Sequence, residues 1–408
     1  MFLDEHTKTR LLKMSIGQRT ENALYYLLAP HLLGYWTFLK PDHEGKELGD
    51  VLFVYGDVCI IFEVKAREKP GLANHVWIGS KLKEAFSQIH SNRSLLSSGQ
   101  VSNIRNAWRG EISWSSLGVK YYHGIVVINH DSDPYDPREM EPILFASSKL
   151  PVHVVSLYDL NELLRFINTP WDFVVYWEFR HQFGKQYQLL VHKEESIYRG
   201  ILTNWAALAK EQQPRHPESK LEEERRFVEG YTLAIMNPDK ADDSTRSKIA
   251  ASYLIDIAAI NLMTKADQDE TGKRVGSREH NKVVETIEAI SDLSRRRRAE
   301  YGSVWLRCAR SCLESSQAIS ESGFSPSRKR AYVFQARPGP QLDERAFLDI
   351  ALITMAKNDA SSCVALTATA DNVIYTFESL MAAIMESEFK VNPSRLINVT
   401  AVFINRPD

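Results

Sequence analysis

The feature that most constrains this chain is a pair of apolar segments, 51–55 and 58–62, separated only by Gly56-Asp57. Both segments are rich in β-branched and aromatic residues, and a Gly-Asp pair between such segments is typical of a two-residue β-hairpin turn. The turn also fixes the register, because residues at equal distances from it face each other. We therefore predict the cross-strand pairs Tyr55–Val58, Val54–Cys59, Phe53–Ile60, Leu52–Ile61 and Val51–Phe62.

At the open end of this hairpin the same register places Asp50 opposite Glu63, and the alternation of side chains puts Lys65 on the face of Glu63. Two carboxylates that face each other repel, because their Cβ atoms lie about 4.5–5.5 Å apart. A Mg²⁺ ion between them would remove the repulsion, and a lysine adds a point charge for a phosphate. The alternative is two unrelated acids at a strand end, each in water, and the hairpin alone does not choose between them.

The composition is that of a soluble globular protein, with 408 residues, 44% hydrophobic, 25% charged and a net charge of −2, and it suggests two or three domains. The near-neutral charge excludes neither nucleic acid nor other partners. No apolar segment reaches transmembrane length and the N-terminus lacks the pattern of a signal peptide, so we expect no membrane association. Four cysteines in so long a chain indicate a reducing compartment, and we expect the cytoplasm.

Two predicted helices flank the hairpin. The first covers 16–29 and carries Glu21, which is either a surface acid favoured by the helix dipole or a third acid of a metal site. The second covers 81–96, with Ser80 as its N-cap, and carries Gln88 beside its apolar stripe. An ordinary half-buried amide is the simpler interpretation of that glutamine.

Further strands are predicted at 119–128 and 151–157, followed by a short helix at 159–168. With the hairpin and its helices they predict a mixed sheet with helices on its faces, in a domain covering 1–190. The segment 171–183 is rich in aromatic residues and also contains Arg180 and His181. Such a mixture can stack on bases, but its spacing favours a buried stripe.

The C-terminal part, 191–408, is predicted to be mainly helical and to end in a small α/β unit. Helices are expected at 195–211, 219–236, 244–264 and 279–295. A loop is expected at 320–330. The α/β end is expected to contain strands at 331–335, 362–367, 372–377 and 396–405, and helices at 345–357 and 378–387. The role of this part is open between recognition, partner binding and regulation.

Four consecutive arginines form the strongest basic run of the chain: Arg295, Arg296, Arg297 and Arg298. On a surface they would contact phosphates and give a salt-dependent affinity for nucleic acid. The alternative is a solvated helix face, partly neutralised by Glu300. The chain has no glycine-rich phosphate loop before a helix, no His-Glu-x-x-His and no Gly-x-Ser-x-Gly, so the common nucleotide-binding, zinc-protease and esterase patterns are absent.

Four short segments, taken in order, resemble the PD-(D/E)XK nuclease superfamily, which has the restriction-endonuclease-like fold. They are Gly17-Gln-Arg-Thr-Glu21, Glu47-Leu-Gly-Asp50, Glu63-Val-Lys65 and Ala85-Phe-Ser-Gln88. The resemblance covers about 14–160, and Gly49 replaces the proline that gives the family its name. It implies a helix bearing a glutamate, a hairpin with Asp and Glu-x-Lys, a helix that often bears a glutamine, and further strands. Nothing in the C-terminal half resembles a known family.

The resemblance implies a metal-dependent nuclease that hydrolyses phosphodiester bonds, with DNA the expected substrate and RNA not excluded. Asp50, Glu63 and the backbone carbonyl of Val64 would hold Mg²⁺ or Mn²⁺, and Glu21 would complete the shell or hold a second ion. Lys65 would orient or deprotonate the attacking water or neutralise charge on phosphorus, and Gln88 would position Lys65 or a phosphate. By analogy, the process would be bacterial antiviral defence or DNA processing, with a protein partner or a homo-oligomer formed through the C-terminal half. The alternative is a non-catalytic nucleic-acid-binding or assembly protein that keeps the fold.

Overall fold

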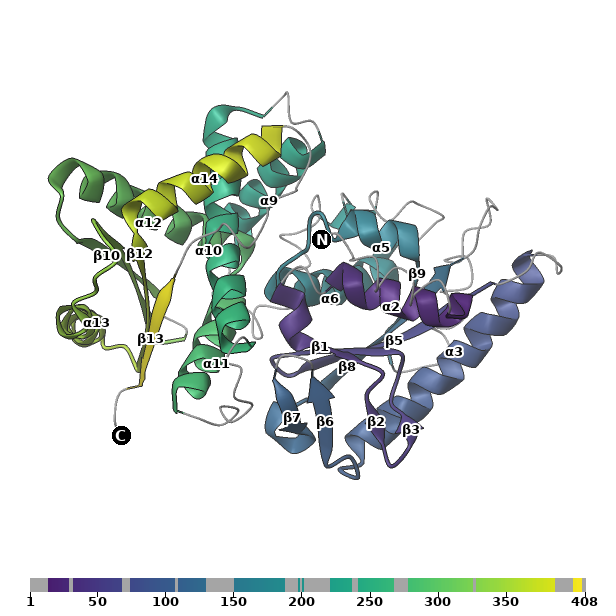
Figure 1. Ribbon diagram of the computed structural model, residues 1–408. Helices are drawn as coiled ribbons and strands as arrows, with labels where there is room; N and C mark the ends of the chain where they lie inside the picture. The colour runs from purple at the N-terminus through teal and green to yellow at the C-terminus, as the bar shows by residue number, and fades with distance from the viewer. Residues whose placement is uncertain are drawn as a thin grey trace. The chain divides into compact units, whose positions relative to one another are not determined.

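A computed structural model of the chain divides into two compact units, Met1–Leu208 (unit 1) and Ala209–Asp408 (unit 2), both drawn in Figure 1. The predicted domain boundary at residue 190 falls inside unit 1. The protein is a mixed α/β chain whose C-terminal half is largely helical, as the sequence predicted. The structure describes residues 14–28, 32–67, 74–106, 109–129, 150–187, 197–198, 200–201, 221–236, 241–267, 278–325, 328–385 and 399–405.

Unit 1 is built on a five-stranded mixed sheet with the strand order β1-β4-β5-β8-β9. Strand β4 runs antiparallel to both of its neighbours, whereas β5, β8 and β9 run parallel to one another. The β4–β5 hairpin therefore lies inside the sheet, and its residues are buried on both faces. The strands are β1 (Thr37–Leu39), β4 (Val51–Tyr55), β5 (Val58–Ala66), β8 (Tyr121–Asn129) and β9 (Val152–Ser156).

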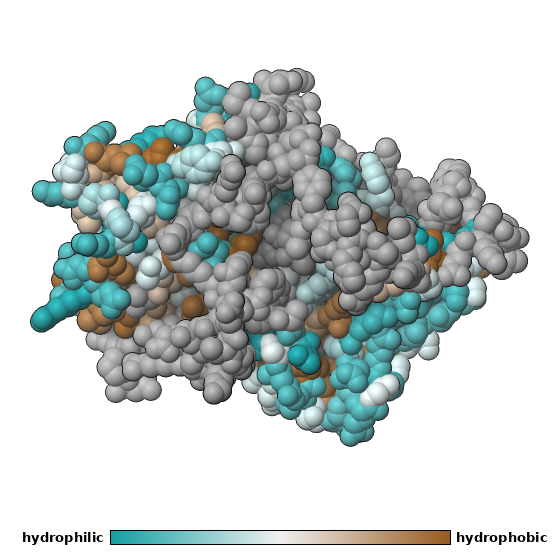
Figure 2. Space-filling model, viewed as in Figure 1, coloured by the Kyte–Doolittle hydropathy of each residue, from teal (hydrophilic) through white to brown (hydrophobic). Residues whose placement is uncertain are grey.

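Helix α3 (Asn74–Ser97) packs on one face of this sheet through its buried residues Leu82, Ala85 and Ile89. Its outer side is hydrophilic, as the lower right of Figure 2 shows. Helix α6 (Pro170–Tyr187) covers the other face, where the ring of Phe173 contacts the rings of β4 and β5. Hydrophobic burial on both faces thus holds the hairpin rigidly, which matters for the groups at its open end.

The remaining described elements of unit 1 are short except for one helix. They are α2 (Ile16–Leu28), α5 (Leu157–Leu163), the 3-10 turns η1 (Leu32–Trp36) and η2 (Trp114–Leu117), and two small ribbons, β2 (Asp42–His43) with β3 (Lys46–Glu47) and β6 (Asn103–Asn106) with β7 (Gly110–Ser113).

Most predicted elements of unit 1 are present, with two corrections. The second helix begins at Asn74, so Ser80 lies inside it and is not its N-cap. Strand β1 adds an edge to the sheet that was not predicted from the sequence. The aromatic segment belongs to α6, where Phe173, Tyr176, Trp177 and Phe179 are buried, as its spacing predicted.

Unit 2 combines helices with a four-stranded sheet of order β10-β11-β12-β13. Helices pack on strand β11 (Arg330–Arg337). Trp305 of α12 (Arg295–Ser315) donates a 3.0 Å hydrogen bond to the carbonyl of Gln335 in this strand. Phe347 of α13 (Glu344–Asn358) packs in a cluster with Val333 of β11. The helices are α9 (Leu221–Met236), α10 (Asp243–Asp267), α11 (Arg278–Ser291), α12 (Arg295–Ser315), α13 (Glu344–Asn358) and α14 (Ala370–Met385). The strands are β10 (Ile319–Ser325), β11 (Arg330–Arg337), β12 (Ser362–Thr369) and β13 (Thr400–Asn405).

Two predictions for unit 2 were wrong. The segment 320–330, expected to be a loop, contains β10, which pairs along its whole length with β11. The segment 372–377, expected to be a strand, lies inside helix α14. The predicted helix at 195–211 falls largely outside the described residues. Within the part of the chain that is described, no helix is long and apolar enough to cross a membrane.

Candidate active site

The register of the β4–β5 hairpin is the predicted one, from Tyr55–Val58 at the turn to Val51–Phe62 at the open end. Gly56 adopts a left-handed backbone conformation at the turn, with φ 59°, which glycine adopts at little cost. Asp50 follows directly beyond the last pair, and its N–H donates to the carbonyl of Phe62 at 3.1 Å. The rigid hairpin therefore fixes the backbone of Asp50 against β5.

Gly49, where the sequence resemblance leads one to expect a proline, has φ 137°. Proline is confined to φ near −65°, so it does not fit this conformation. A Cβ atom at Gly49 would also lie only 3.2 Å from Cγ2 of Ile61. The backbone path before Asp50 therefore favours glycine at this position and excludes proline.

The carboxylate of Asp50 turns toward β5, where its Oδ2 accepts a 2.6 Å hydrogen bond from the N–H of Val64. This bond holds the aspartate beside the strand that carries Glu63 and Lys65. From the sequence, Val64 was expected to contribute only a carbonyl ligand, and that role stays a prediction; the structure adds a role for the Val64 N–H, which orients Asp50.

Lys65 lies on the face of Glu63, as predicted, with 3.5 Å between its Nζ and Glu63 Oε2. The ammonium donates a 2.6 Å hydrogen bond to Oε1 of Gln88 and lies 3.5 Å from Oε1 of Glu84. Gln88 and Glu84 are one helical turn apart on α3, so this helix supplies both contacts. The lysine is 9% exposed, and its position is therefore restricted by the strand, the helix and three polar neighbours.

Glu63 is buried, and its Oε1 accepts a 3.1 Å hydrogen bond from the side-chain amide of Asn92. Sequence reasoning missed Asn92, although a signal was present. Glu84, Gln88 and Asn92 are spaced four residues apart, and residues with that spacing lie on one face of a helix. That polar stripe on α3 faces the acidic end of the hairpin.

Burial is the main cause that raises the pKa values of both acids, and nearby carboxylates add to it. Burial raises the pKa of Asp50 to about 6; the hydrogen bond from Val64 opposes the change, and the charge of Glu21 adds to it. Burial also raises the pKa of Glu63 to about 8, with the charge of Asp50 as the next cause and Lys65 acting in the opposite direction. The charge of Lys65 acts to lower both pKa values but does not outweigh burial, so the ionised forms of both acids stay disfavoured.

Glu21, on α2, forms an ion pair with Lys40, which follows β1. It is near enough to Asp50 to affect the pKa of that aspartate. Burial acts to lower the pKa of Lys40, but the hydrogen bond and charge of Glu21, together with the charges of Glu47 and Asp50, outweigh it and raise that pKa. Sequence reasoning placed Glu21 correctly on a helix near the site and missed its lysine partner.

The donor set fits a hard divalent cation. Such ions prefer carboxylate oxygens, and Asp50 and Glu63 offer two carboxylates whose ionised forms are disfavoured until a positive charge approaches. Among the described residues, no group of three or more His, Cys, Asp or Glu side chains is arranged to hold a metal ion. The fit therefore rests on this pair of acids.

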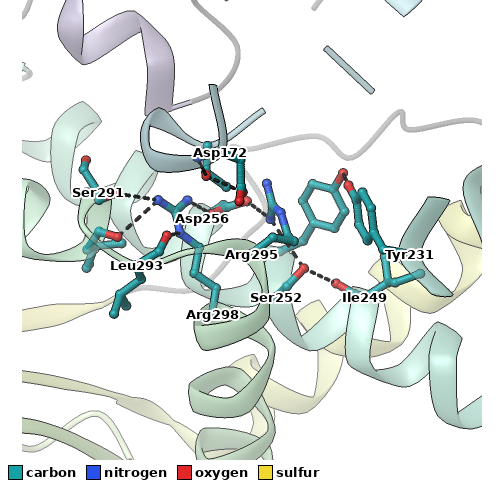
Figure 3. Close-up of polar contacts among 12 residues, drawn as sticks. Asp172, Tyr231, Ile249, Ser252, Asp256, Ser291, Leu293, Arg295 and Arg298 are labelled. Carbon is teal, nitrogen blue, oxygen red and sulfur yellow. Dashed lines mark hydrogen bonds and ion pairs between the residues drawn. The ribbon is translucent and has the colours of Figure 1, made fainter. Parts of the chain in front are cut away.

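The arginine run begins helix α12, and the structure corrects the expectation that it forms a phosphate-contacting surface. Arg295 and Arg298 both pair with Asp256 of α10, and Arg298 also donates to the backbone carbonyls of Leu293 and Ile290 (Figure 3). Arg296 and Arg297 both pair with Glu300. Burial is nearly complete for Arg295, Arg296 and Arg298. Arg295 and Arg298 thus join α12 to α10 within unit 2, a role that was not predicted. Arg296 and Arg297 are neutralised by Glu300 within α12, as the alternative interpretation expected.

Comparison of the chain with protein-family models, curated proteins and solved structures finds no match in any of the three.

Proposed function

We propose that this protein is a divalent-metal-dependent nuclease with a restriction-endonuclease-like N-terminal domain, acting on DNA. The observation that carries the proposal is the gathering of Asp50, Glu63 and Lys65 at one end of a buried hairpin, with Gln88 hydrogen-bonded to the lysine. The order of helix α2, hairpin, helix α3 and further strands is also the order that the family resemblance implies.

Asp50 and Glu63 would hold a Mg²⁺ or Mn²⁺ ion. When bound, such an ion polarises a phosphoryl oxygen and lowers the pKa of a coordinated water. The protein contributes the orientation of the two acids. The N–H of Val64 fixes Asp50, and Asn92 fixes Glu63. Outer contacts of this kind matter for metal affinity, and their loss typically costs 10–100-fold.

In addition to the charge of the metal ion, the protein itself supplies the positive charge of Lys65. Positioned ammonium groups stabilise the charge that develops during phosphoryl transfer, and Lys65 would do so or orient the attacking water. Gln88 acts as a positioning residue, because its oxygen directs the ammonium. Both residues meet on the face of the sheet that carries Glu63, so they can act on one phosphate.

The test is a cleavage assay with supercoiled plasmid, linear duplex, single-stranded DNA and RNA across a titration of Mg²⁺ and Mn²⁺. We expect cleavage of DNA that depends on metal and that Asp50→Asn, Glu63→Gln and Lys65→Ala each reduce by about 10³-fold or more. Lys120→Ala is the matched control, because that lysine is exposed and pairs with Asp57 at the turn end of the hairpin.

Retained cleavage in pure, folded Lys65→Ala protein would remove the assignment of Lys65. Binding of DNA without cleavage under every metal condition would instead favour the alternative, a non-catalytic nucleic-acid-binding or assembly protein. Cleavage of RNA alone would keep the chemistry and change the substrate.

A further inference from the structure

Lys40 lies among the acids of the candidate site although it belongs to neither the hairpin nor α3. Its Nζ forms an ion pair with Oε2 of Glu21 and lies 4.0 Å from Oε1 of Glu47. The charge of Asp50 is a further cause that raises the pKa of Lys40. The ammonium thus contacts two of the carboxylates around the open end of the hairpin, those of Glu21 and Glu47, and is near enough to Asp50 to interact with its charge, on the side where Glu21 was expected to bind metal.

The backbone holds Lys40 in this position. Lys40 has φ 43°, in the left-handed region that residues with a side chain rarely adopt. Its N–H donates a 2.9 Å hydrogen bond to the carbonyl of Asp50. The residue that carries the ammonium is therefore tied directly to the residue that carries the principal acid, through a backbone conformation that disfavours most side chains.

Charge balance around the site indicates how many divalent ions it can take. Four carboxylates, those of Glu21, Glu47, Asp50 and Glu63, influence one another or Lys40 electrostatically. Lys40 and Lys65 supply two positive charges, so these six groups carry a net charge of −2 when fully ionised. Glu84, which also approaches Lys65, is balanced by its own ion pair with Lys81 and leaves this total unchanged. One divalent cation neutralises that charge, whereas a second would leave an excess of positive charge.

We propose that the ammonium of Lys40 takes the place of a second divalent ion, so that the site binds a single Mg²⁺ at Asp50 and Glu63 while Glu21 stays paired with lysine. This inference rests on the proposed function and specifies it. It assigns Lys40 as a positioning residue that limits metal stoichiometry, and it removes Glu21 from the ligands of the ion in the intact protein.

The test measures the number of Mn²⁺ ions bound per chain, by electron paramagnetic resonance of free Mn²⁺ and by calorimetry, on the full-length protein. Lys40→Gly removes the ammonium and suits the left-handed backbone, so the fold is expected to persist; Lys40→Asn is a second variant that tolerates this conformation. We expect one ion in the wild type and two in both variants. The double variant Lys40→Gly/Glu21→Gln is expected to return to one, and Lys120→Ala to stay at one.

Two ions in the wild type, or one in folded Lys40→Gly and Lys40→Asn proteins, would overturn the role of Lys40 and leave the proposed function standing. A second ion that persists in the double variant would also overturn it, because the added site would then not involve Glu21. Failure of the proposed function gives a different result, in which the single ion of the wild type is absent or survives in Asp50→Asn and Glu63→Gln.

Discussion

The ammonium of Lys65 donates a 2.6 Å hydrogen bond to Oε1 of Gln88, and this bond joins strand β5 to helix α3 at the acidic end of the hairpin. The two residues lie 23 positions apart in the chain. Their contact gives Lys65 a fixed direction that the strand alone would not impose on a side chain with four rotatable bonds.

Loss of this bond should reduce catalysis without loss of the fold. We expect Gln88→Ala to lower the cleavage rate by about 10–100-fold, with Mn²⁺ affinity and the melting temperature nearly unchanged. Gln88→Glu should change the pH profile of cleavage, because a carboxylate beside Lys65 favours the charged form of the lysine. Ser94→Ala, on the exposed side of the same helix, is the control. An unchanged rate and pH profile in both Gln88 variants would exclude a positioning role.

Metal-free stability should fall as pH rises. The pKa values of Asp50 and Glu63, about 6 and about 8, exceed those of ordinary carboxyl groups, so the folded state binds protons more strongly than the unfolded chain. The resulting contribution to the free energy of unfolding is present at about pH 4 and is lost as pH rises through about 8. We expect the melting temperature in EDTA to decrease over this interval and saturating Mg²⁺ to restore it at high pH.

The variant Glu63→Gln, which removes the charge of the glutamate, tests the same pH dependence. Near pH 8.5 and without metal, Glu63→Gln should be more stable than the wild type by about 1–3 kcal/mol, since a tenfold change in proton affinity corresponds to about 1.4 kcal/mol. Near pH 4 the two proteins should differ little. A metal-free wild type whose stability rises between about pH 5 and about pH 8 would contradict the raised pKa values.

Substitutions at Asn92 distinguish an effect on metal binding from an effect on metal-free stability. Its amide donates to Glu63 in a buried position, and Asn92→Asp places a third carboxylate there. We expect lower metal-free stability at pH 8, because a like charge adds to the repulsion, and a larger increase in melting temperature on adding Mg²⁺ than in the wild type. Asn92→Ala should instead decrease metal affinity. Equal responses of the wild type and both variants to Mg²⁺ would show that the ion binds elsewhere.

The Asp256 cluster should be a structural element of unit 2. Asp256 pairs with Arg295 and Arg298, and removal of one partner from a buried pair costs about 3–5 kcal/mol. We expect Arg298→Ala to lower the free energy of unfolding by this amount in urea denaturation. Arg307 lies on the same helix as Arg298 and forms an exposed pair with Glu321 of β10. Arg307→Ala should therefore cost less than about 1 kcal/mol. A stable Arg298→Ala protein that loses only nucleic-acid affinity would restore the phosphate-contact interpretation.

The hairpin was predictable because its determinants are local. A two-residue turn fixes the register, and two-sided hydrophobic burial follows from uninterrupted apolar segments. The prediction of Ser80 as N-cap was wrong because the apolar stripe of α3 continues before it, through the buried Ile78, in a helix that begins at Asn74. The segment 372–377 is rich in β-branched and aromatic residues, as strands are, yet it continues the helix that starts at Ala370 and buries Val373 and Phe377.

The site was only partly predictable, because its remaining contacts join elements that are distant in sequence. Lys65 and Glu63 share a face through strand alternation alone. Lys40 approaches Glu21 only after the chain has folded β1 alongside β4, and no spacing rule encodes that approach. The arginine run shows the same limit, since its partner Asp256 lies 39 residues before Arg295.

The most direct measurement of the central claim is a crystal structure of the protein soaked with Mn²⁺ and recorded at the manganese absorption edge. We predict one anomalous peak within coordination distance of the carboxylates of both Asp50 and Glu63, and its loss in Glu63→Gln. Carboxylates that point apart with no peak between them, in crystals that contain Mn²⁺, would contradict a shared ion and with it the proposed chemistry.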